Sequence, residues 1–242
     1  MKKTYLFAIV MITTLLNTMQ AADVFTTKSG KCIEFVAIKH SSIRIVYDDK
    51  EIAIDPVTKL PPVTDFTTFP KADYIFVTHE HFDHCDSLAV AQLSKEGTVV
   101  IANANSAKLL GKGDVMHNGD KKELAPDITV EAVPAYNITE GETQFHPKGR
   151  DNGYIITLDG FRIYIAGDTE DIPELADVKD IDVAFLPCNQ PFTMLPKQLV
   201  KAAAVVAPKV LFPYHLGDTN LNEVDAELQA LDMDVRILKS YK

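Results

Sequence analysis

Three histidines and an aspartate fall within six residues of this chain, in the segment from Thr78 to His84. Imidazole and carboxylate together suit zinc, with iron or manganese as other occupants. On a helix, ligands on one face need a spacing of four residues, which His79 and His81 do not have. On an extended segment residues i and i+2 point the same way, so these two can share one metal. A turn can then bring Asp83 and His84 towards a second ion.

This cluster begins where a buried strand is expected to end, since residues 74–77 form a short apolar run bounded by turn signals. Packing can explain one histidine, but it does not explain three of them with an aspartate directly after such a strand. Two further candidates also end apolar runs: Asp168 follows residues 163–166, and His215 lies just beyond residues 210–212. A helix cap or a turn is the other interpretation of Asp168. Together these positions predict a metal site at the ends of strands.

The elements that must position these residues are short strands in both halves of the chain. Two hairpins are predicted: residues 43–47 and 52–54 flank a polar segment at 48–51, and residues 154–158 and 161–165 flank Asp159-Gly160. Further strands are expected at residues 99–101, 128–133, 183–186, 210–212 and 235–238, and helices at residues 87–95, 196–206 and 222–231. Hairpins mixed with helix-separated strands predict an α/β fold of two packed sheets with helices outside.

The first 22 residues differ from the rest and have the layout of a secretory signal peptide. Lys2 and Lys3 precede an apolar run, residues 5–16, and small residues follow at Ala21 and Ala22. The run is shorter than the roughly 20 residues that a membrane-spanning helix needs, although an uncleaved anchor is the alternative. We therefore expect a periplasmic or extracellular protein with no membrane span after cleavage. Residues 23–242 contain no linker or repeat and predict a single domain.

The charge of that domain narrows the choice of partners. Beyond the leader there are 22 basic and 34 acidic side chains, a formal charge of −12. Such an acidic surface repels phosphate backbones, which argues against nucleic acid as a partner. The three cysteines are widely spaced and form no disulfide framework. No feature indicates an oligomeric state.

The motifs occur in the order His79-x-His81-x-Asp83-His84, then Gly167-Asp168-Thr169, then His215. In this order they resemble those of the metallo-β-lactamase fold superfamily, over nearly the whole chain after the leader. The resemblance implies an αββα sandwich, two mixed β-sheets flanked by helices. Residues 152–156 and 165–169 are similar to the branch that contains the ascorbate-6-phosphate lactonase. The Gly-Asp-Thr context differs from the cysteine-containing second site usual in antibiotic-degrading members.

The resemblance also implies a two-metal hydrolase acting on a small molecule. Its six ligands would be His79 and His81 for the first ion, Asp83, His84 and His215 for the second, and Asp168 as the bridge. A metal-activated water would attack a small ester, lactone, amide or phosphoester. Asp83 would help to orient that water or manage its proton.

One position departs from the superfamily pattern. A further metal-binding histidine is expected after residues 128–133, but Asn137 stands there. His146 is the first candidate for the missing ligand, with a substrate contact or a plain loop residue as the alternatives. Asn137 and Lys148 are candidate substrate contacts, Lys148 as an anchor for an anionic group or else as a solvated lysine. The departure also motivates another function, a non-catalytic metal-binding or ligand-sensing domain with a degenerate first metal site.

Four other residues carry weaker expectations. Cys85 directly follows the cluster and either reaches the second metal or packs beneath the site. His40 and His117 have no partner at a useful spacing and are expected at the surface. Tyr214 faces either the substrate or the core.

Overall fold

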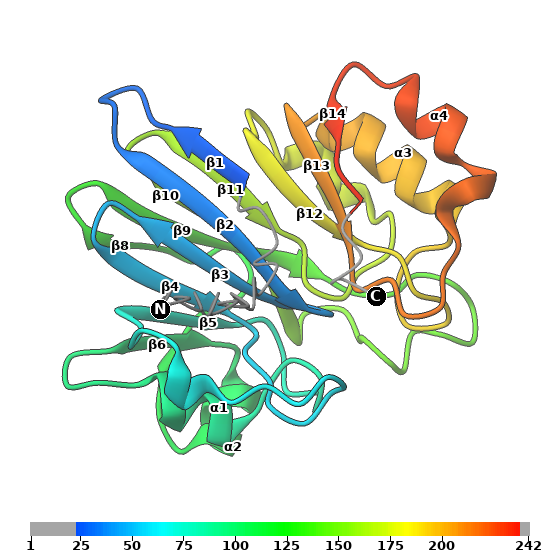
Figure 1. The fold of residues 1–242 in the computed structure, drawn as a ribbon. Coiled ribbons are helices and arrows are strands. Elements are labelled where there is room, and N and C mark those ends of the chain that lie inside the picture. Colours follow the sequence, from blue (N-terminus) through cyan, green and yellow to red (C-terminus); the bar gives the residue numbers. More distant parts are fainter. Residues whose placement is uncertain (1–22, 238–242) are drawn as a thin grey trace, which may run out of the picture.

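The computed structural model describes residues 23–237, which form two seven-stranded sheets (Figure 1). The predicted signal peptide, residues 1–22, lies outside the described residues. Within residues 23–237, every helix is too short or too polar to cross a membrane.

The first sheet is built by the N-terminal half of the chain, with its strands side by side in sequence order. Its strands are β1 (Asp23–Thr26), β2 (Cys32–Lys39), β3 (Ser42–Tyr47), β4 (Lys50–Ile54), β5 (Tyr74–Val77), β6 (Val99–Ala102) and β7 (Asp114–Val115). Strands β1 to β4 pair antiparallel, and β4 to β7 pair parallel. The parallel strands therefore end at the same edge of the sheet.

The second sheet repeats this plan with the C-terminal half of the chain. Its strands are β8 (Lys121–Ala125), β9 (Ile128–Ala135), β10 (Asp151–Leu158), β11 (Phe161–Ile165), β12 (Val183–Pro187), β13 (Val210–Tyr214) and β14 (Asp234–Val235). Strands β8 to β11 pair antiparallel, and β11 to β14 pair parallel. Both sheets are therefore mixed.

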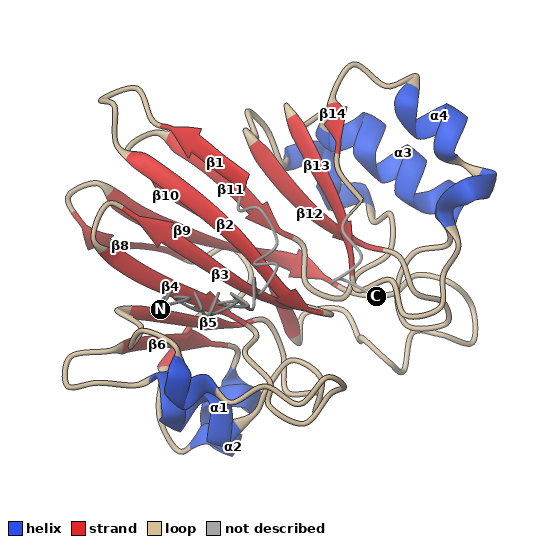
Figure 2. Cartoon of the chain, viewed as in Figure 1, coloured by secondary structure: helices blue, strands red, loops and turns tan. Residues whose placement is uncertain are grey.

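Helices cover the outer face of each sheet (Figure 2). They are α1 (Ser87–Leu93), α2 (Ala104–Leu110), α3 (Pro196–Val206) and α4 (Asp225–Gln229), with 3-10 turns at Phe66–Thr68, Pro173–Asp177 and Leu221–Glu223. Apolar side chains of α1 and α2 pack with β5 and β6, and those of α3 and α4 pack with β11 to β13. A third core fills the space between the sheets, around Ile45, Phe76 and Phe185. The result is the four-layer αββα sandwich that the resemblance implied.

Burial patterns explain why these segments form these strands. In β3 the buried residues Ile43, Ile45 and Tyr47 alternate with half-buried ones, as expected for a strand with one face towards the core. Every residue of β12 is buried, since helices cover one face and the other sheet covers the second. Both predicted hairpins are present, as β3–β4 and β10–β11.

The predicted elements agree with the structure in most places and differ at the edges. The expected helix at 196–206 is α3, whereas the one expected at 222–231 is divided into a 3-10 turn and the shorter α4. The edge strands β1, β7 and β8 and the helix α2 were not predicted, because these segments are short and their periodicity is weak.

The two sheets approach each other closely where β5 and β11 end. Gly167 has a left-handed φ of 65°, and a Cβ atom there would lie 2.9 Å from the Asn152 carbonyl oxygen and 3.2 Å from the Thr78 Cβ. Only glycine satisfies both conditions. The Thr78 carbonyl also accepts a hydrogen bond from the Asn152 N–H at 3.1 Å. This close approach places the residues after β5 beside those after β11.

Candidate metal centre

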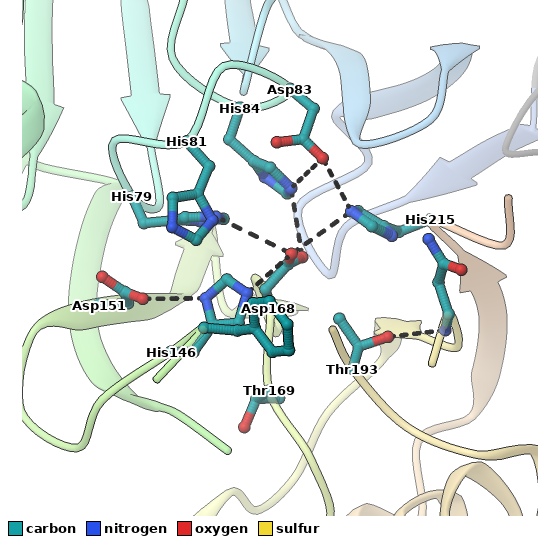
Figure 3. Close-up of polar contacts among 12 residues, drawn as sticks. His79, His81, Asp83, His84, His146, Asp151, Asp168, Thr169, Thr193 and His215 are labelled. Carbon is teal, nitrogen blue, oxygen red and sulfur yellow. Dashed lines mark hydrogen bonds and ion pairs between the residues drawn. The ribbon is translucent and has the colours of Figure 1, made fainter. Parts of the chain in front are cut away.

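The predicted site residues come from four connections that meet at one edge of the sandwich (Figure 3). Residues His79 to His84 follow β5, Asp168 follows β11 and His215 follows β13. His146 lies in the loop between β9 and β10. Residues separated by more than 130 positions thus form one cluster of imidazole and carboxylate groups.

Asp168 lies at the centre of this cluster. Its Oδ1 atom is 3.2 Å from the Nε2 atom of His84, and its Oδ2 atom is 3.4 Å from the Nε2 atoms of both His146 and His215. His79 Nε2 is 3.9 Å from the same Oδ2 atom. One carboxylate that faces four imidazoles from two sides has the placement needed to bridge two cations.

The first group of potential ligands consists of His79, His81 and His146. Their ring centroids are 4.6 to 4.9 Å apart, and one nitrogen from each lies within 4.8 Å of the others. Since His79 and His81 follow β5 as i and i+2 neighbours, their rings reach the same space, as expected for extended backbone. His146 supplies a third imidazole where the sequence shows Asn137 in place of the expected histidine.

The loop between β9 and β10 explains how His146 takes that place. The Asn137 N–H donates to the His146 carbonyl at 2.9 Å, which closes the loop across eight intervening residues. The His146 ring is held by Asp151, whose Oδ2 atom is 3.0 Å from Nδ1. Asn137 is buried, and its side-chain NH₂ points to the Pro191 carbonyl at 3.5 Å. Histidine and asparagine are therefore brought together by backbone closure.

The second group consists of Asp83, His84 and His215, joined by His40. Asp83 Oδ2 is 3.5 Å from His215 Nε2 and 3.1 Å from His40 Nε2. The prediction that His40 lies at the surface is therefore wrong. Its side chain is only 15% exposed, and its ring centroid is 3.7 Å from that of His215.

His40 reaches the site because it sits in the two-residue turn between β2 and β3. The turn gives His40 a left-handed φ of 47°, an uncommon conformation for a residue other than glycine that occurs preferentially at functional sites. The His40 carbonyl accepts from the His215 N–H at 3.3 Å, and the Ser41 hydroxyl donates to the Asp83 carbonyl at 2.9 Å. The hairpin thus holds both Asp83 and His215.

The far nitrogens of three imidazoles are held by neighbouring oxygens. His84 Nδ1 lies 2.8 Å from Asp55 Oδ2, and His79 Nδ1 lies 3.0 Å from the Thr78 hydroxyl. His146 is held by Asp151 in the same way. Metal-binding histidines commonly use such partners to fix the ring and its tautomer.

The near nitrogens show that the site fits a cation. Within residues 23–237, the Nε2 atoms of His79, His84, His146 and His215 are buried without a hydrogen-bond partner, and they converge on Asp168. Buried polar atoms are rarely left without one. Imidazole nitrogens that face a buried carboxylate in this way have the arrangement of ligands around divalent metal ions.

The buried carboxylates of the cluster also favour a positive charge beside them. Burial alone would lower the pKa of His84, but Asp168, Asp55 and Asp83 raise it well above its usual value. Burial raises the pKa of Asp168, yet the nearby rings of His215 and His84 outweigh this and hold it well below the ordinary range. The Asp168 carboxylate therefore stays ionised, and without a metal a proton on His84 offsets part of the negative charge. A divalent cation would supply that charge more fully.

The remaining predicted residues lie around this centre. Cys85 packs beneath the site in the core with Val77, and burial raises the pKa of its thiol to about 11. Tyr214 lies in the core between the sheets, and His117 is exposed at the surface. Lys148 Nζ forms an ion pair with Glu174 at 2.7 Å. The role of Lys148 as a substrate anchor stays a prediction.

Several residues of the site were missed from the sequence. Asp55 is fully buried and follows β4, so its position at the end of an apolar strand gave the same signal as Asp168. Asp151 begins β10, and its carboxylate also accepts from Arg150, with Nε to Oδ1 at 2.7 Å. His40 had no local signal, because its partners lie 43 or more positions away.

Comparisons with known proteins agree with this fold and site. A family model described as a beta-lactamase superfamily domain matches residues 34–215. A UPF0173 metal-dependent hydrolase of Enterococcus faecalis is 34% identical over 193 residues, which cover 76% of this chain and 86% of that protein.

Two solved structures are also similar. One, from Parabacteroides distasonis and named as a metal-dependent hydrolase, has 53% identity and a TM-score of 0.86, and the match covers 90% of this chain and 97% of the other. Igni18, a metallo hydrolase from Ignicoccus hospitalis, has 25% identity and a TM-score of 0.72, with 87% and 96% covered. This chain therefore belongs to the beta-lactamase superfamily and, within it, to the UPF0173 metal-dependent hydrolases.

Proposed function

We propose that this metal-dependent hydrolase holds two divalent cations, zinc or else manganese or iron, and cleaves a small ester, lactone, amide or phosphoester. The observation that carries the proposal is the convergence of four buried imidazole Nε2 atoms on the carboxylate of Asp168. The first ion would be held by His79, His81 and His146, and the second by Asp83, His84 and His215, with Asp168 between them. When bound, such ions lower the pKa of water and polarise the scissile bond.

The chain's own residues would then orient the reacting groups. Asp83 lines the open side of the site and is 19% exposed, so it can accept a hydrogen bond from the attacking water. Burial alone would raise the pKa of Asp83. His84, His215 and His40 outweigh this effect and hold the pKa well below the ordinary range. The ionised carboxylate would orient the water by accepting a hydrogen bond from it.

The imidazoles of His79, His81 and His146 argue against the alternative function, a non-catalytic metal-binding or ligand-sensing domain. A non-catalytic domain was motivated by Asn137, which would leave His79 and His81 without a third ligand. His146 lies where it can complete that set, so the geometry favours catalysis. The likeness to the ascorbate-6-phosphate lactonase branch stays a prediction.

The proposal is tested with purified protein that has been stripped of metal and then loaded with zinc or manganese. We expect two ions per chain by mass spectrometry, and turnover of at least one class among neutral esters, lactones, amides and phosphoesters. Chelation should abolish that turnover and lower the melting temperature, because a ligand that binds only the folded state stabilises it. A fully loaded protein that turns over no substrate class would contradict the proposal.

We also propose that the enzyme is exported, on the basis of the charged start and apolar run of residues 1–22. Expression with the leader, followed by fractionation and N-terminal sequencing, tests this directly. A mature N-terminus near Asp23 in the exported fraction is expected, and an uncut chain in the cytoplasmic fraction would contradict it.

A further inference from the structure

The pocket that leads to the metal centre has an apolar wall. Its volume is about 320 Å³, and half of its lining residues belong to the metal centre. The other four are Phe82, Phe145, Phe192 and Asn189. Three phenylalanines thus supply the apolar part of the lining, beside side chains of the metal centre that are polar or charged.

Two of these phenylalanines are exposed to an extent that packing does not explain, and Phe145 is half-buried. Phe82 is 78% exposed and Phe192 39% exposed. The rings of Phe145 and Phe192 pack edge to face, with centroids 5.0 Å apart. Large exposed apolar side chains that gather at one place mark a binding surface. Here they gather beside His81 and Asp83.

The pocket contains no cationic side chain among the described residues that line it. The two cations of the neighbouring loop are already paired: Lys148 with Glu174, and Arg150 with Asp151, each at 2.7 Å. Asp83 and Asp168 add negative charge to the lining. Apart from bound metal ions, the lining therefore offers no lysine or arginine to an anionic group such as a phosphate or a second carboxylate.

Asn189 provides the one neutral polar side chain in this lining. Its backbone is fixed by a turn, in which the Asn189 N–H donates to the Thr193 hydroxyl at 2.7 Å and the Asn189 carbonyl accepts from the Phe192 N–H at 3.0 Å. A Cβ atom at Gly217 would lie 3.0 Å from the Asn189 side-chain oxygen, so glycine there leaves room for the amide. An amide can both donate to and accept from a neutral polar group.

We propose that this pocket selects an uncharged substrate with an aryl-sized apolar group, a neutral ester, lactone or amide. The apolar group lies against Phe82, Phe145 and Phe192, and the Asn189 amide bonds to a neutral polar atom beside the scissile bond. This inference rests on the proposed function, because it names the substrate class of the same site.

The test compares carboxylates that share one metal-binding group and differ in the rest. Acetate, phenylacetate and succinate are titrated into the zinc-loaded protein by calorimetry. Because burial of a phenyl group contributes at least about 1.4 kcal/mol, we expect phenylacetate to bind about tenfold or more tightly than acetate. Succinate should bind no more tightly than acetate. Equal affinities for acetate and phenylacetate, or a preference for succinate, would overturn the inference.

Variants of Phe192 test whether the phenylalanines of the pocket cause the preference for phenylacetate. Phe192→Ala should remove most of the difference between phenylacetate and acetate, while Phe192→Leu should keep most of it. The matched control is Leu109→Ala, an apolar residue of α2 that is 55% exposed and lies outside the pocket. Circular dichroism checks that each variant folds. If Phe192→Ala folds and keeps the full preference, the wall does not bind the apolar group.

The two proposals fail in different ways. Binding of phenylacetate does not require turnover. A preference for phenylacetate over acetate without hydrolysis of any substrate would therefore contradict only the proposed function. Hydrolysis without any dependence of kcat/KM on the apolar group, measured over acetyl, butanoyl and phenylacetyl esters of one alcohol, would contradict only the present inference.

Discussion

Replacement of Asp55 by asparagine should lower the affinity for one metal ion, although Asp55 is not itself a proposed ligand. The Asp55 carboxylate is fully buried and accepts three contacts: the Thr78 N–H, the Thr78 hydroxyl and His84 Nδ1, each at 2.8 Å. Asparagine has the same shape, but it presents an NH₂ group in place of one oxygen. With its oxygen on the Thr78 N–H, that NH₂ faces His84 Nδ1.

This exchange changes the tautomer of His84. In the metal-bound wild type, Nδ1 would donate its hydrogen to Asp55, which leaves the lone pair of Nε2 for the metal. In Asp55→Asn, Nδ1 has to accept a hydrogen bond, and the ring proton moves to Nε2, where it competes with a metal. Loss of such a partner typically lowers metal affinity 10- to 100-fold, equivalent to about 1.4–2.7 kcal/mol.

Competition with a chromophoric chelator measures the two affinities separately. We expect the weaker-bound ion of Asp55→Asn to lose affinity in that range, and the other ion to change much less. Asp49→Asn removes the same charge from a side chain that is 84% exposed, and it should bind both ions as the wild type does. If folded Asp55→Asn holds both ions with wild-type affinity, Asp55 does not fix the tautomer of His84.

Two further predictions concern imidazoles of the metal centre, and a third concerns a carboxylate remote from it. His146→Ala should reduce the bound metal from two ions to one by mass spectrometry; two retained ions would show that His146 is not a ligand. His40→Ala should weaken metal binding at the Asp83 position, whereas the exposed control His117→Ala should not, and equal affinities in the two variants would contradict a role for His40. Lys31 and then Tyr47 lower the pKa of Asp127, so its ionised form stabilises the fold above the unfolded pKa of about 3.9 and the contribution is lost as the pH falls through the lower folded pKa. Asp127→Asn should therefore be less stable than the wild type to urea at pH 7 but equal to it near pH 2, and a difference that persists at pH 2 would refute this.

The amino-acid sequence determined much of the metal site because part of it is local. His79 and His81 are two residues apart on extended backbone, so their shared direction follows from strand geometry. Asp168 and His215 could be added because each ends an apolar run. The hairpins β3–β4 and β10–β11 were predictable for the same reason, since turn chemistry and alternation are properties of neighbouring residues.

Only the tertiary structure decided which distant residues complete the site. The backbone hydrogen bond from Asn137 to His146 brings the third imidazole of the first group into place, and no local pattern specifies such a closure. His40 was expected at the surface because nothing near it in sequence could partner it, yet the β2–β3 turn places it against Asp83. A contact across 43 residues depends on how the strands pair and on where the loops close, and composition and spacing along the chain do not encode those distances. The metal-binding chemistry could therefore be predicted from the sequence. The packing of the two sheets and their loops decided which residues complete each group of potential ligands and which phenylalanines lie beside them.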